Sequence, residues 1–598
     1  MQLSPWALTG VVLVAAVTYY LGHRSSRLAN STHDFLVARR TVRSRRNAAA
    51  ISGEYISAAS FLGIAGIVLK DGADGLWYPI GFTAGYLALM LFVAAPLRRS
   101  GAYTLPDFIE ARLGSVALRR CATWFVVFVG ILYLVPQLQG AGLALKTVLP
   151  DWPWAVPVGA VVVAVLVVSN VLAGGMRAIT LVQAFQYWLK LFAIAVPAFV
   201  LCVVFVAGQH PGPAGALGSA APPTFGNQTT VDIQADVVLR VDSVTPVRIL
   251  PPGGGAERAA VWAGGATEQV AAGTKLIFPA GTPSPTVTDA VSSNSDWLRP
   301  GAGGVQDMLQ TYSLLIALFL GTMGLPHVLV RFYTNPDGKA ARRTAAHVLL
   351  LLGLFYLFPI VLGAMSRMYV PELLVTGKTD AAVLELPHAM LPGIAGQVLT
   401  AVVMAGAFAA FLSTSSGLLV SIAGVVSTDV FSRGRVSDFR WSTVLVGIVS
   451  VVLALGVRPT DLSLSVGMSF ALAASTFAPV LVLGIWWRGL TWPGAMAGMV
   501  VGGGLVLGAL AVNTAGRYTG SWAPWLTDQP ALVTVPVAFA VTVLVSVATR
   551  AGKPADVNVV MLRLHAPDPL GFMRDRAIAR FGQIDASRVR EGRGRHRR

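Results

Sequence analysis

Residues 51–66 read ISGEYISAASFLGIAG, and this stretch decides how the fold of the chain is interpreted. It has the place and length of a membrane-spanning helix, yet it contains Glu54, three serines and three glycines. A charged side chain at the centre of a bilayer costs about 2.5–3.5 kcal/mol on insertion scales, so it rarely lies there without a partner or a function. Glycine and serine weaken the helix and free backbone carbonyls for other partners. The stretch therefore predicts a cation site formed by a broken helix inside the membrane.

The composition indicates a polytopic membrane protein. Of the 598 residues, 55% are hydrophobic and only 12% are charged, and the mean hydropathy is +0.66. We predict an all-α membrane protein with about thirteen spans, each long enough to cross a hydrocarbon core of about 30 Å. The two cysteines, Cys121 and Cys202, both lie in these spans and indicate no disulfide framework. The predicted spans lie near 4–21, 48–70, 76–97, 119–147, 154–173, 180–207, 306–331, 344–369, 393–427, 440–457, 462–486, 491–513 and 531–549.

The net charge of +17 is distributed as in a membrane protein. Arginines gather in 24–46, in 98–120 and in the tail from 550 onward, and further basic residues follow the seventh and ninth spans. These segments share one side if the N-terminus is outside, which satisfies the positive-inside rule. We therefore predict a plasma-membrane protein with a cytoplasmic C-terminus, whose basic tail contacts anionic lipid rather than nucleic acid.

Four segments follow along the chain. Residues 1–207 hold spans one to six, 208–305 form an insertion predicted to lie outside, 306–549 hold spans seven to thirteen, and 550–598 form the basic tail. The insertion is rich in Pro, Gly, Ser and Thr, but TTVDIQADVVLRVD and GTKLIFPAG alternate or are β-branched, which predicts a small β-hairpin module between flexible flanks. In the tail, DPLGFMRDRAIARFGQI predicts an amphipathic helix on the inner membrane face.

Span seven has the same unusual character as span two. It reads LLIALFLGTMGLPHVLVRF and is interrupted by Gly321, Gly324 and Pro326. Each of these two spans opens a group of five, spans 2–6 and 7–11. Interrupted spans at corresponding places in two halves indicate a five-plus-five inverted repeat, with the transport site at the breaks.

Span nine contains four consecutive hydroxyl residues, Ser413 to Ser416, in AFAAFLSTSSGLLVS. Sodium is a hard cation that prefers about five or six oxygens, and neutral hydroxyls with carbonyls supply them without burying a carboxylate. The alternative is that these hydroxyls bond to carbonyls of their own helix or mediate close helix packing. With the carbonyls of Gly53 and Ile56 as opposing donors, we favour the cation site.

The chain resembles the sodium:solute symporter family over nearly all of residues 1–550, and most of all its acetate permease branch. The resemblance is carried by the motifs at 52–66, 74–82, 171–183, 321–334 and 411–431, among them VLAGGMRAITLVQ and GTMGLPHVLVRFYT. The insertion at 208–305 is longer than the expected loop and lies outside the resemblance. A membrane enzyme is disfavoured, because the eight histidines are scattered without ligand spacing.

The resemblance implies a sodium site with carbonyl ligands from Gly53, Ile56 and Ala410 and hydroxyl ligands from Ser413 and Thr414. The hydroxyl pair favours sodium over proton coupling. Acetate permeases have Asp where this chain has Glu54, so Glu54 is expected to act as a gating or supporting carboxylate or to face water rather than to bind the ion.

Substrate contacts are expected at the breaks. The predicted substrate-binding residues are Tyr55, Ser57, Ser60, Tyr133, Gln137 and His327. Half-helix N–H groups near the first three suit a carboxylate. For His327 the alternative is a hydrogen-bonded packing residue, and for Gln137 and Gln139 it is hydrogen bonding between helices.

Two basic residues lie within predicted spans. Lys190 is expected to extend its ammonium to the inner interface rather than to pair with substrate. Arg331 is expected to contact headgroups or a loop carboxylate at the inner end of span seven.

The sequence thus predicts a symporter that couples sodium entry to uptake of a small organic anion, such as acetate or another short-chain monocarboxylate, by alternating access. The alternatives are a sodium- or proton-coupled symporter of another small solute, such as proline, a sugar or another acid, or else a transporter-derived sensor or a channel. The oligomeric state is not readable from the sequence.

Overall fold

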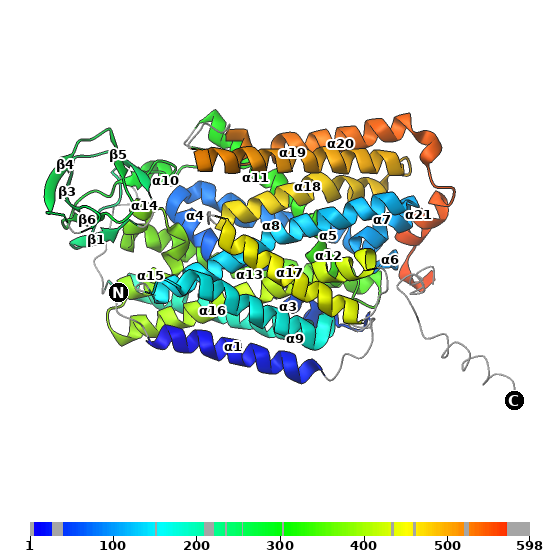
Figure 1. Ribbon diagram of the computed structural model, residues 1–598, viewed down its shortest axis with the longest axis horizontal. Helices are drawn as coiled ribbons and strands as arrows, with labels where there is room; N and C mark the ends of the chain where they lie inside the picture. Colours follow the sequence, from blue (N-terminus) through cyan, green and yellow to red (C-terminus); the bar gives the residue numbers. More distant parts are fainter. Residues whose placement is uncertain are drawn as a thin grey trace.

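The computed structural model describes residues 5–26, 40–149, 152–208, 221–233, 236–253, 255–301, 304–431, 436–457, 462–519 and 525–570. Long helices run side by side in one bundle, with the β strands at one end and α21 (Val557–His565) at the other (Figure 1). Helix α1 (Pro5–Ser26) begins at the end that carries the strands. The predicted all-α architecture with a small β insertion is confirmed.

The first half of the bundle consists of α3 (Ser44–Tyr55), the π-helical turn η2 (Ala59–Gly63), α4 (Ile64–Asp71), α5 (Trp77–Phe92), α6 (Ala94–Arg99), α7 (Leu105–Leu113), α8 (Val116–Val148) and α9 (Ala155–Val206). The second half consists of α11 (Val305–Gly324), α12 (Pro326–Phe332), α13 (Gly338–Tyr369), α14 (Glu372–Thr376), α15 (Ala382–Met390), α16 (Ile394–Val425), η6 (Val426–Val430), α17 (Val436–Gly456), α18 (Leu462–Trp486), α19 (Trp492–Thr519) and α20 (Ala531–Ala548).

Both predicted breaks are present. Helix α3 ends at Tyr55, and Ile56 has φ −71° and ψ 84°, outside the helical region, before the chain resumes helical structure. In the second break, Leu325 is extended between α11 and α12, whose axes differ by 41°. Pro326 occupies the first position of α12, where its missing N–H costs no hydrogen bond.

The number of spans differs from the predicted thirteen. Within the described ranges, eleven helices are long and apolar enough to cross a membrane, or twelve if α11 and α12 form one span. Residues Ala59–Phe92 count as one of these, whereas the sequence predicts parts of two spans there. The short 3-10 helix η3 (Gly72–Leu76), which starts at a glycine with φ +62°, separates α4 from α5 inside that stretch. The count of thirteen and the inverted repeat stay predictions.

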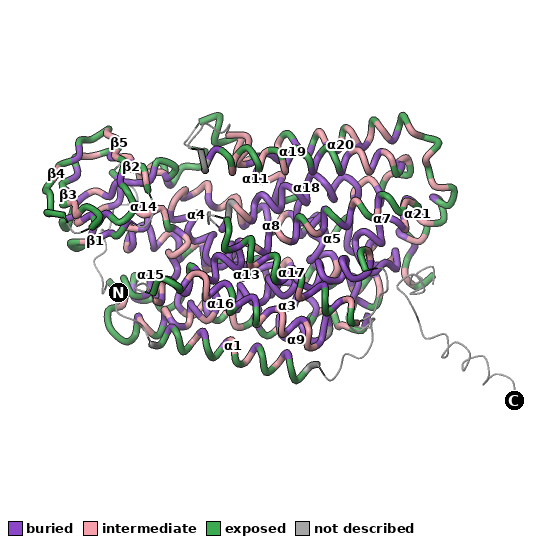
Figure 2. Tube along the Cα trace, in the orientation of Figure 1, coloured by how far each residue is buried: buried purple, intermediate pink, exposed green. Residues whose placement is uncertain are grey.

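The middle of the bundle is closely packed, and its outer faces are apolar. Helix α16 packs against α8 and α9, and its residues 406–425 are all buried. Figure 2 shows buried residues through the centre and exposed ones along the peripheral helices. Large exposed apolar side chains on these helices include Leu13, Phe199, Leu350, Trp441 and Leu544. Outward apolar faces around a packed interior are the arrangement that a lipid environment requires.

The insertion forms a β module, defined here as residues 221–297. Its strands are β1 (Thr229–Asp232), β2 (Val237–Val241), β3 (Thr245–Leu250), β4 (Arg258–Trp262), β5 (Ala266–Val270), β6 (Lys275–Phe278) and β7 (Thr286–Val287), followed by α10 (Asn294–Trp297). They build an antiparallel sheet in the order β1-β6-β3-β4 and a second in the order β5-β2-β7. The predicted β structure is confirmed, while the flank 209–220 lies outside the described residues.

The β module is joined to the bundle by specific contacts. Arg367, near the end of α13, donates from Nε to Asn294 Oδ1 at 3.1 Å and from Nη2 to the Ser292 carbonyl at 2.7 Å. Trp297 donates from Nε1 to the Val68 carbonyl at 2.7 Å, and its ring lies 5.8 Å from the Arg367 guanidinium carbon. The module therefore rests on the ends of α4 and α13.

At the opposite end, the start of the tail contacts the bundle. Asp568 accepts hydrogen bonds from Arg99 Nε at 2.9 Å and from the Lys339 N–H at 3.0 Å. The predicted amphipathic helix at 568–584 lies, from residue 571 onward, outside the described residues.

Candidate functional site

The first break frees backbone carbonyls at the C-terminal end of α3. Ser57 donates its N–H to the Tyr55 carbonyl at 2.8 Å instead of to the Gly53 carbonyl, which a continued helix would use. The C-terminal end of a helix carries partial negative charge on its unpaired carbonyls. The freed carbonyls of Gly53 and Ile56 are therefore suited to a cation.

A cation of the protein itself lies at this position. The ammonium of Lys190, from α9, donates to the Gly53 carbonyl, to the Ile56 carbonyl at 2.7 Å and to Ser413 Oγ at 2.9 Å. The side chain is 0% exposed. The prediction that Lys190 extends to the inner interface was therefore wrong: the side chain points inward, and polar partners rather than water satisfy it.

The five predicted sodium ligands do come together between α3 and α16. Ser413 Oγ also donates to the Ala410 carbonyl at 3.1 Å, and Thr414 Oγ1 donates to the Glu54 carbonyl at 2.6 Å. Three of the five ligands, however, accept from Lys190. In this arrangement the oxygens do not fit a sodium ion, because an ammonium already fills the space among them.

Glu54 and Arg331 form a buried ion pair at the first break, where Glu54 lies two residues before Ile56. Arg331 Nε lies 2.7 Å from Glu54 Oε2, and both side chains are 1% exposed. Arg331 also donates to Thr180 Oγ1 at 2.9 Å and to Gln183 Oε1, while Gln183 Nε2 donates to the Ser413 carbonyl at 2.8 Å. The expectation that Arg331 contacts headgroups was wrong, and so was the alternative in which Glu54 faces water. At this depth the carboxylate and the guanidinium stabilise each other.

Two glycines permit these close approaches. A Cβ atom on Gly53 would lie 2.2 Å from the Gln183 carbonyl oxygen, so any larger residue would push α3 away from α9. A Cβ atom on Gly417 would lie 2.0 Å from Glu54 Oε1. The glycines therefore allow α3 to lie against α9 and α16 closely enough for Lys190 and Glu54 to reach their partners.

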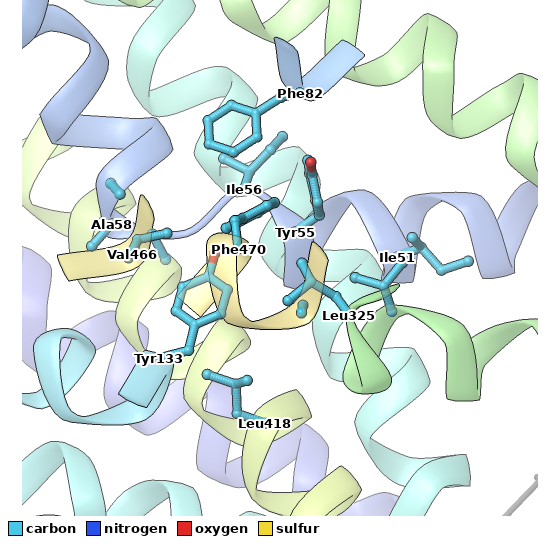
Figure 3. Packing of buried hydrophobic residues seen from close by; sticks show 14 of the residues in the cluster. Ile51, Tyr55, Ile56, Ala58, Phe82, Tyr133, Leu325, Leu418, Val466 and Phe470 are labelled. Carbon is cyan, nitrogen blue, oxygen red and sulfur yellow. The ribbon is translucent and has the colours of Figure 1, made fainter. Parts of the chain in front are cut away.

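An aromatic cluster surrounds the first break. Figure 3 shows Tyr55, Phe82, Tyr133 and Phe470 around the turn through Ile56 and Ala58. The Tyr55 and Phe82 ring centroids are 5.7 Å apart, those of Phe82 and Phe470 are 5.1 Å apart, and those of Tyr133 and Phe470 are 6.0 Å apart. Such spacing is that of packed aromatic pairs. The break thus faces an apolar enclosure.

All six predicted substrate residues are buried around this enclosure: Tyr55, Ser57, Ser60, Tyr133, Gln137 and His327. Tyr55 Oη and Thr322 Oγ1 are 2.7 Å apart, which connects the first break to α11. Gln137 Oε1 accepts from the Ala58 N–H at 3.2 Å. Gln139 instead donates to the carbonyls of Ala454 and Val457, so it joins two helices, as the alternative for this residue predicted.

The polar atoms at the enclosure that have no hydrogen-bond partner within the described part of the chain include two from predicted substrate residues. These two are Nε2 of Gln137 and Nε2 of His327, and both side chains are at most 1% exposed. The His327 ring lies beside Tyr133, with centroids 5.3 Å apart. Buried polar groups normally have partners, so these two atoms are candidate contacts for a ligand.

A match to a family model decides the family, and two relatives are similar to nearly the whole chain. The model of the sodium:solute symporter family matches residues 35–212 and 261–502. An uncharacterized symporter, YwcA, of Bacillus subtilis (strain 168) is 29% identical over 550 residues, covering 89% of this chain and 91% of that protein. A monocarboxylic acid transporter of Corynebacterium glutamicum is 28% identical over 588 residues, covering 95% of both chains.

The chain belongs to the sodium:solute symporter family. A solved structure, a Na⁺-coupled sialic acid symporter in a substrate-bound outward-open state, shares the fold with a TM-score of 0.58 and 14% sequence identity, covering 90% of this chain and 98% of that one. The family match is interrupted at 213–260, so the prediction that the whole insertion lies outside the resemblance was wrong for residues 208–212 and 261–305.

The symporter contains functional positions that sequence reasoning missed. Gln183, Tyr187 and Lys190 are spaced four and three residues apart, which places them on one face of α9. That face packs against α3, and the spacing was the available indication that Lys190 points inward. Phe82 and Phe470 gave no such indication, because an apolar residue in a span is equally compatible with lipid contact.

A second polar cluster in the symporter lies towards the end of the bundle that carries α21. Arg119, at the start of α8, lies 2.6 Å from Glu110 Oε2 and 2.5 Å from Asp429 Oδ1. Thr123 Oγ1 donates to Asp429 Oδ2 at 2.6 Å. The cluster joins α7, α8 and η6, and it is separate from the site at the break.

Proposed function

We propose that this symporter takes up a small organic anion, a short-chain monocarboxylate such as acetate, together with a coupling cation. The observation that carries the proposal is the charge next to the first break. Lys190 and Arg331 are buried there with one carboxylate, Glu54, so the group has a formal excess of one positive charge. An uncompensated buried charge is costly, and a monoanion bound at the break balances it.

The chemistry of the enclosure supports a short-chain acid. Aromatic side chains provide apolar walls, and the predicted residues Tyr55, Ser57, Tyr133, Gln137 and His327 provide a few polar groups. A binding site of this type orients a small ligand through a small number of polar contacts. The similarity to the monocarboxylic acid transporter of Corynebacterium glutamicum is consistent with such a substrate.

The family indicates which cation is generally coupled to uptake. Sodium coupling is a general property of sodium:solute symporters, and the sialic acid symporter with the same fold is Na⁺-coupled. The proposed uptake of a monocarboxylate does not depend on whether the cation is sodium or a proton. The predicted sodium ligands are Gly53, Ile56, Ala410, Ser413 and Thr414.

Alternating access gives a mechanism for the two breaks. Contacts between α3, α9 and α16 hold the first break in place, and the Tyr55–Thr322 hydrogen bond joins it to α11 near the second. Rocking of one group of helices against the other would expose the enclosure to one side at a time. On the inner side, as the predicted orientation with N-terminus outside defines it, opening would require the Arg119–Asp429 contact to separate.

Counterflow tests this function directly. Proteoliposomes preloaded with unlabelled acetate should accumulate labelled acetate, and propionate or pyruvate should compete, whereas proline and glucose should not. Proteoliposomes that contain the Tyr133→Ala variant serve as the matched control and should lose the accumulation. Accumulation of proline or a sugar instead of any acid would refute the assignment of a monocarboxylate. Uptake that does not saturate would favour a channel.

A further inference from the structure

We propose that the Lys190 ammonium takes the place of a sodium ion between α3 and α16, so that this symporter works without sodium at that position. The part of the proposal that concerns uptake rests on the proposed transport function, whereas the part that concerns ion binding does not. The relevant residues are those expected to bind sodium: Gly53, Ile56 and Ser413.

The hydrogen bonding of Lys190 is complete. An ammonium has three donors and no acceptor. Lys190 has three acceptors, namely two backbone carbonyls from α3 and its end and one hydroxyl from α16. All three donors are therefore used by protein oxygens although the side chain is fully buried. Because these oxygens are neutral, the net positive charge remains to be balanced by an anionic substrate.

The partners of Lys190 distinguish a substitute ion from an ordinary ion-pairing residue. The carboxylate nearest in sequence to these partners, Glu54, accepts a hydrogen bond from Arg331 at 2.7 Å. The three hydrogen bonds of Lys190 go to neutral oxygens. Neutral carbonyls and hydroxyls on two different segments are the donor set that a monovalent cation needs, and the side chain supplies that cation on a tether.

The geometry of α9 makes this placement specific. Gly53 lets α3 approach the backbone of α9 at Gln183, and the Tyr187 Cβ lies 3.3 Å from where a Cβ of Gly53 would be. Lys190 follows Tyr187 by three residues on the same face. Its four-carbon stem therefore brings the ammonium to the carbonyls of Gly53 and Ile56.

A tethered cation has consequences that a free one does not have. Sodium at this position would leave with each transport cycle, whereas Lys190 remains with the protein. The positive charge next to the substrate is then permanent, and external sodium has no vacant ligand set here. Removal of the side chain should recreate that set, since the oxygens of Gly53, Ile56, Ser413, Ala410 and Thr414 would remain.

The first experiment measures ion binding by thermal unfolding of purified full-length protein in detergent. For the wild type, replacing choline chloride with sodium chloride should leave Tm unchanged. For Lys190→Ala, sodium should raise Tm by about 2 °C or more, because a ligand that binds only the folded state stabilises it. The double variant Lys190→Ala/Ser413→Ala should lose this response. Lys553→Ala, which removes an exposed lysine at the end of α20, should behave as the wild type.

The second experiment measures counterflow of labelled acetate by the wild type with sodium or choline on both sides. The rate should change less than about twofold, because no transport step uses sodium at this site. Counterflow that requires sodium would overturn the inference and leave the proposed function intact. Absence of counterflow for every acid, with the Tm results as expected, would overturn the proposed function and leave the inference intact. An equal sodium response in the single and double variants would overturn the inference. A sodium response of the wild-type Tm would overturn it even if Lys190→Ala did not fold.

Discussion

The two broken helices differ in the polar groups at their breaks and in whether those groups already have partners. At the first break, the carbonyls of Gly53 and Ile56 are bonded to the ammonium of Lys190. At the second, Leu325 is extended before Pro326, and His327 Nε2 has no partner among the described residues. One break is therefore filled by a cation of the protein, and the other keeps a polar atom free beside the aromatic enclosure. The first break carries the positive charge that a substrate anion would balance, and the second adds the unpartnered His327 nitrogen to the same enclosure.

The largest effect is expected from breaking the ion pair that supports the first break. Arg331→Gln leaves Glu54 charged and buried without its partner, so the free energy of unfolding should fall by about 3–5 kcal/mol. Thermal or denaturant unfolding in detergent measures this. The double variant Glu54→Gln/Arg331→Gln should recover much of the loss, because no unpaired charge remains. Single variants as stable as the wild type would mean that the pair does not hold the break.

The next effect concerns Lys190 and substrate affinity. In sodium-free medium, Lys190→Ala removes the excess positive charge at the first break, so the apparent affinity for acetate should fall about tenfold or more, equivalent to about 1.4 kcal/mol. Added sodium should restore part of the affinity by occupying the oxygens that Lys190 leaves. Competition in counterflow assays gives the apparent affinity, with Lys553→Ala as the control. An unchanged affinity would show that Lys190 does not act on the substrate.

The second break is tested through His327. His327→Leu keeps the approximate volume but removes both ring nitrogens, and the loss of one hydrogen bond to the substrate should weaken apparent affinity by about 0.5–1.5 kcal/mol. His327→Gln, which retains a polar group, should be less affected. If both variants transport as the wild type does, the histidine serves packing alone and the contrast between the breaks disappears.

The two breaks also differ in how much of their structure could be predicted from the sequence. Gly321, Gly324 and Pro326 predicted the second break, since glycine and proline interrupt helices for local reasons. The joining of Gly53 and Ile56 with Ser413 and Thr414 followed from resemblance to a family. The positions of Lys190 and Arg331 were missed, because their depth along a helix was read without the face on which they lie. Which face points inward depends on the close approach at Gly53, a tertiary feature.

The smallest expected effect lies outside the two breaks and concerns how stability depends on pH at Glu385. Burial, together with the nearby charge of Glu372, raises the pKa of Glu385 to about 7. A carboxyl whose pKa is raised by folding makes its full contribution to the stability of the folded protein below about pH 4.5. This contribution is lost as the pH rises through about 7. Glu385→Gln should therefore raise Tm at about pH 8 and leave it unchanged at about pH 4. Equal Tm changes at both pH values would contradict this assignment.

The central claim is that a lysine, and not a sodium ion, fills the first break. A high-resolution experimental structure of the wild type in sodium chloride tests it most directly. We expect side-chain density from Lys190 that reaches the carbonyls of Gly53 and Ile56 and the hydroxyl of Ser413 at hydrogen-bond distances. A separate ion bound by these oxygens, with the Lys190 side chain turned elsewhere, would contradict the claim.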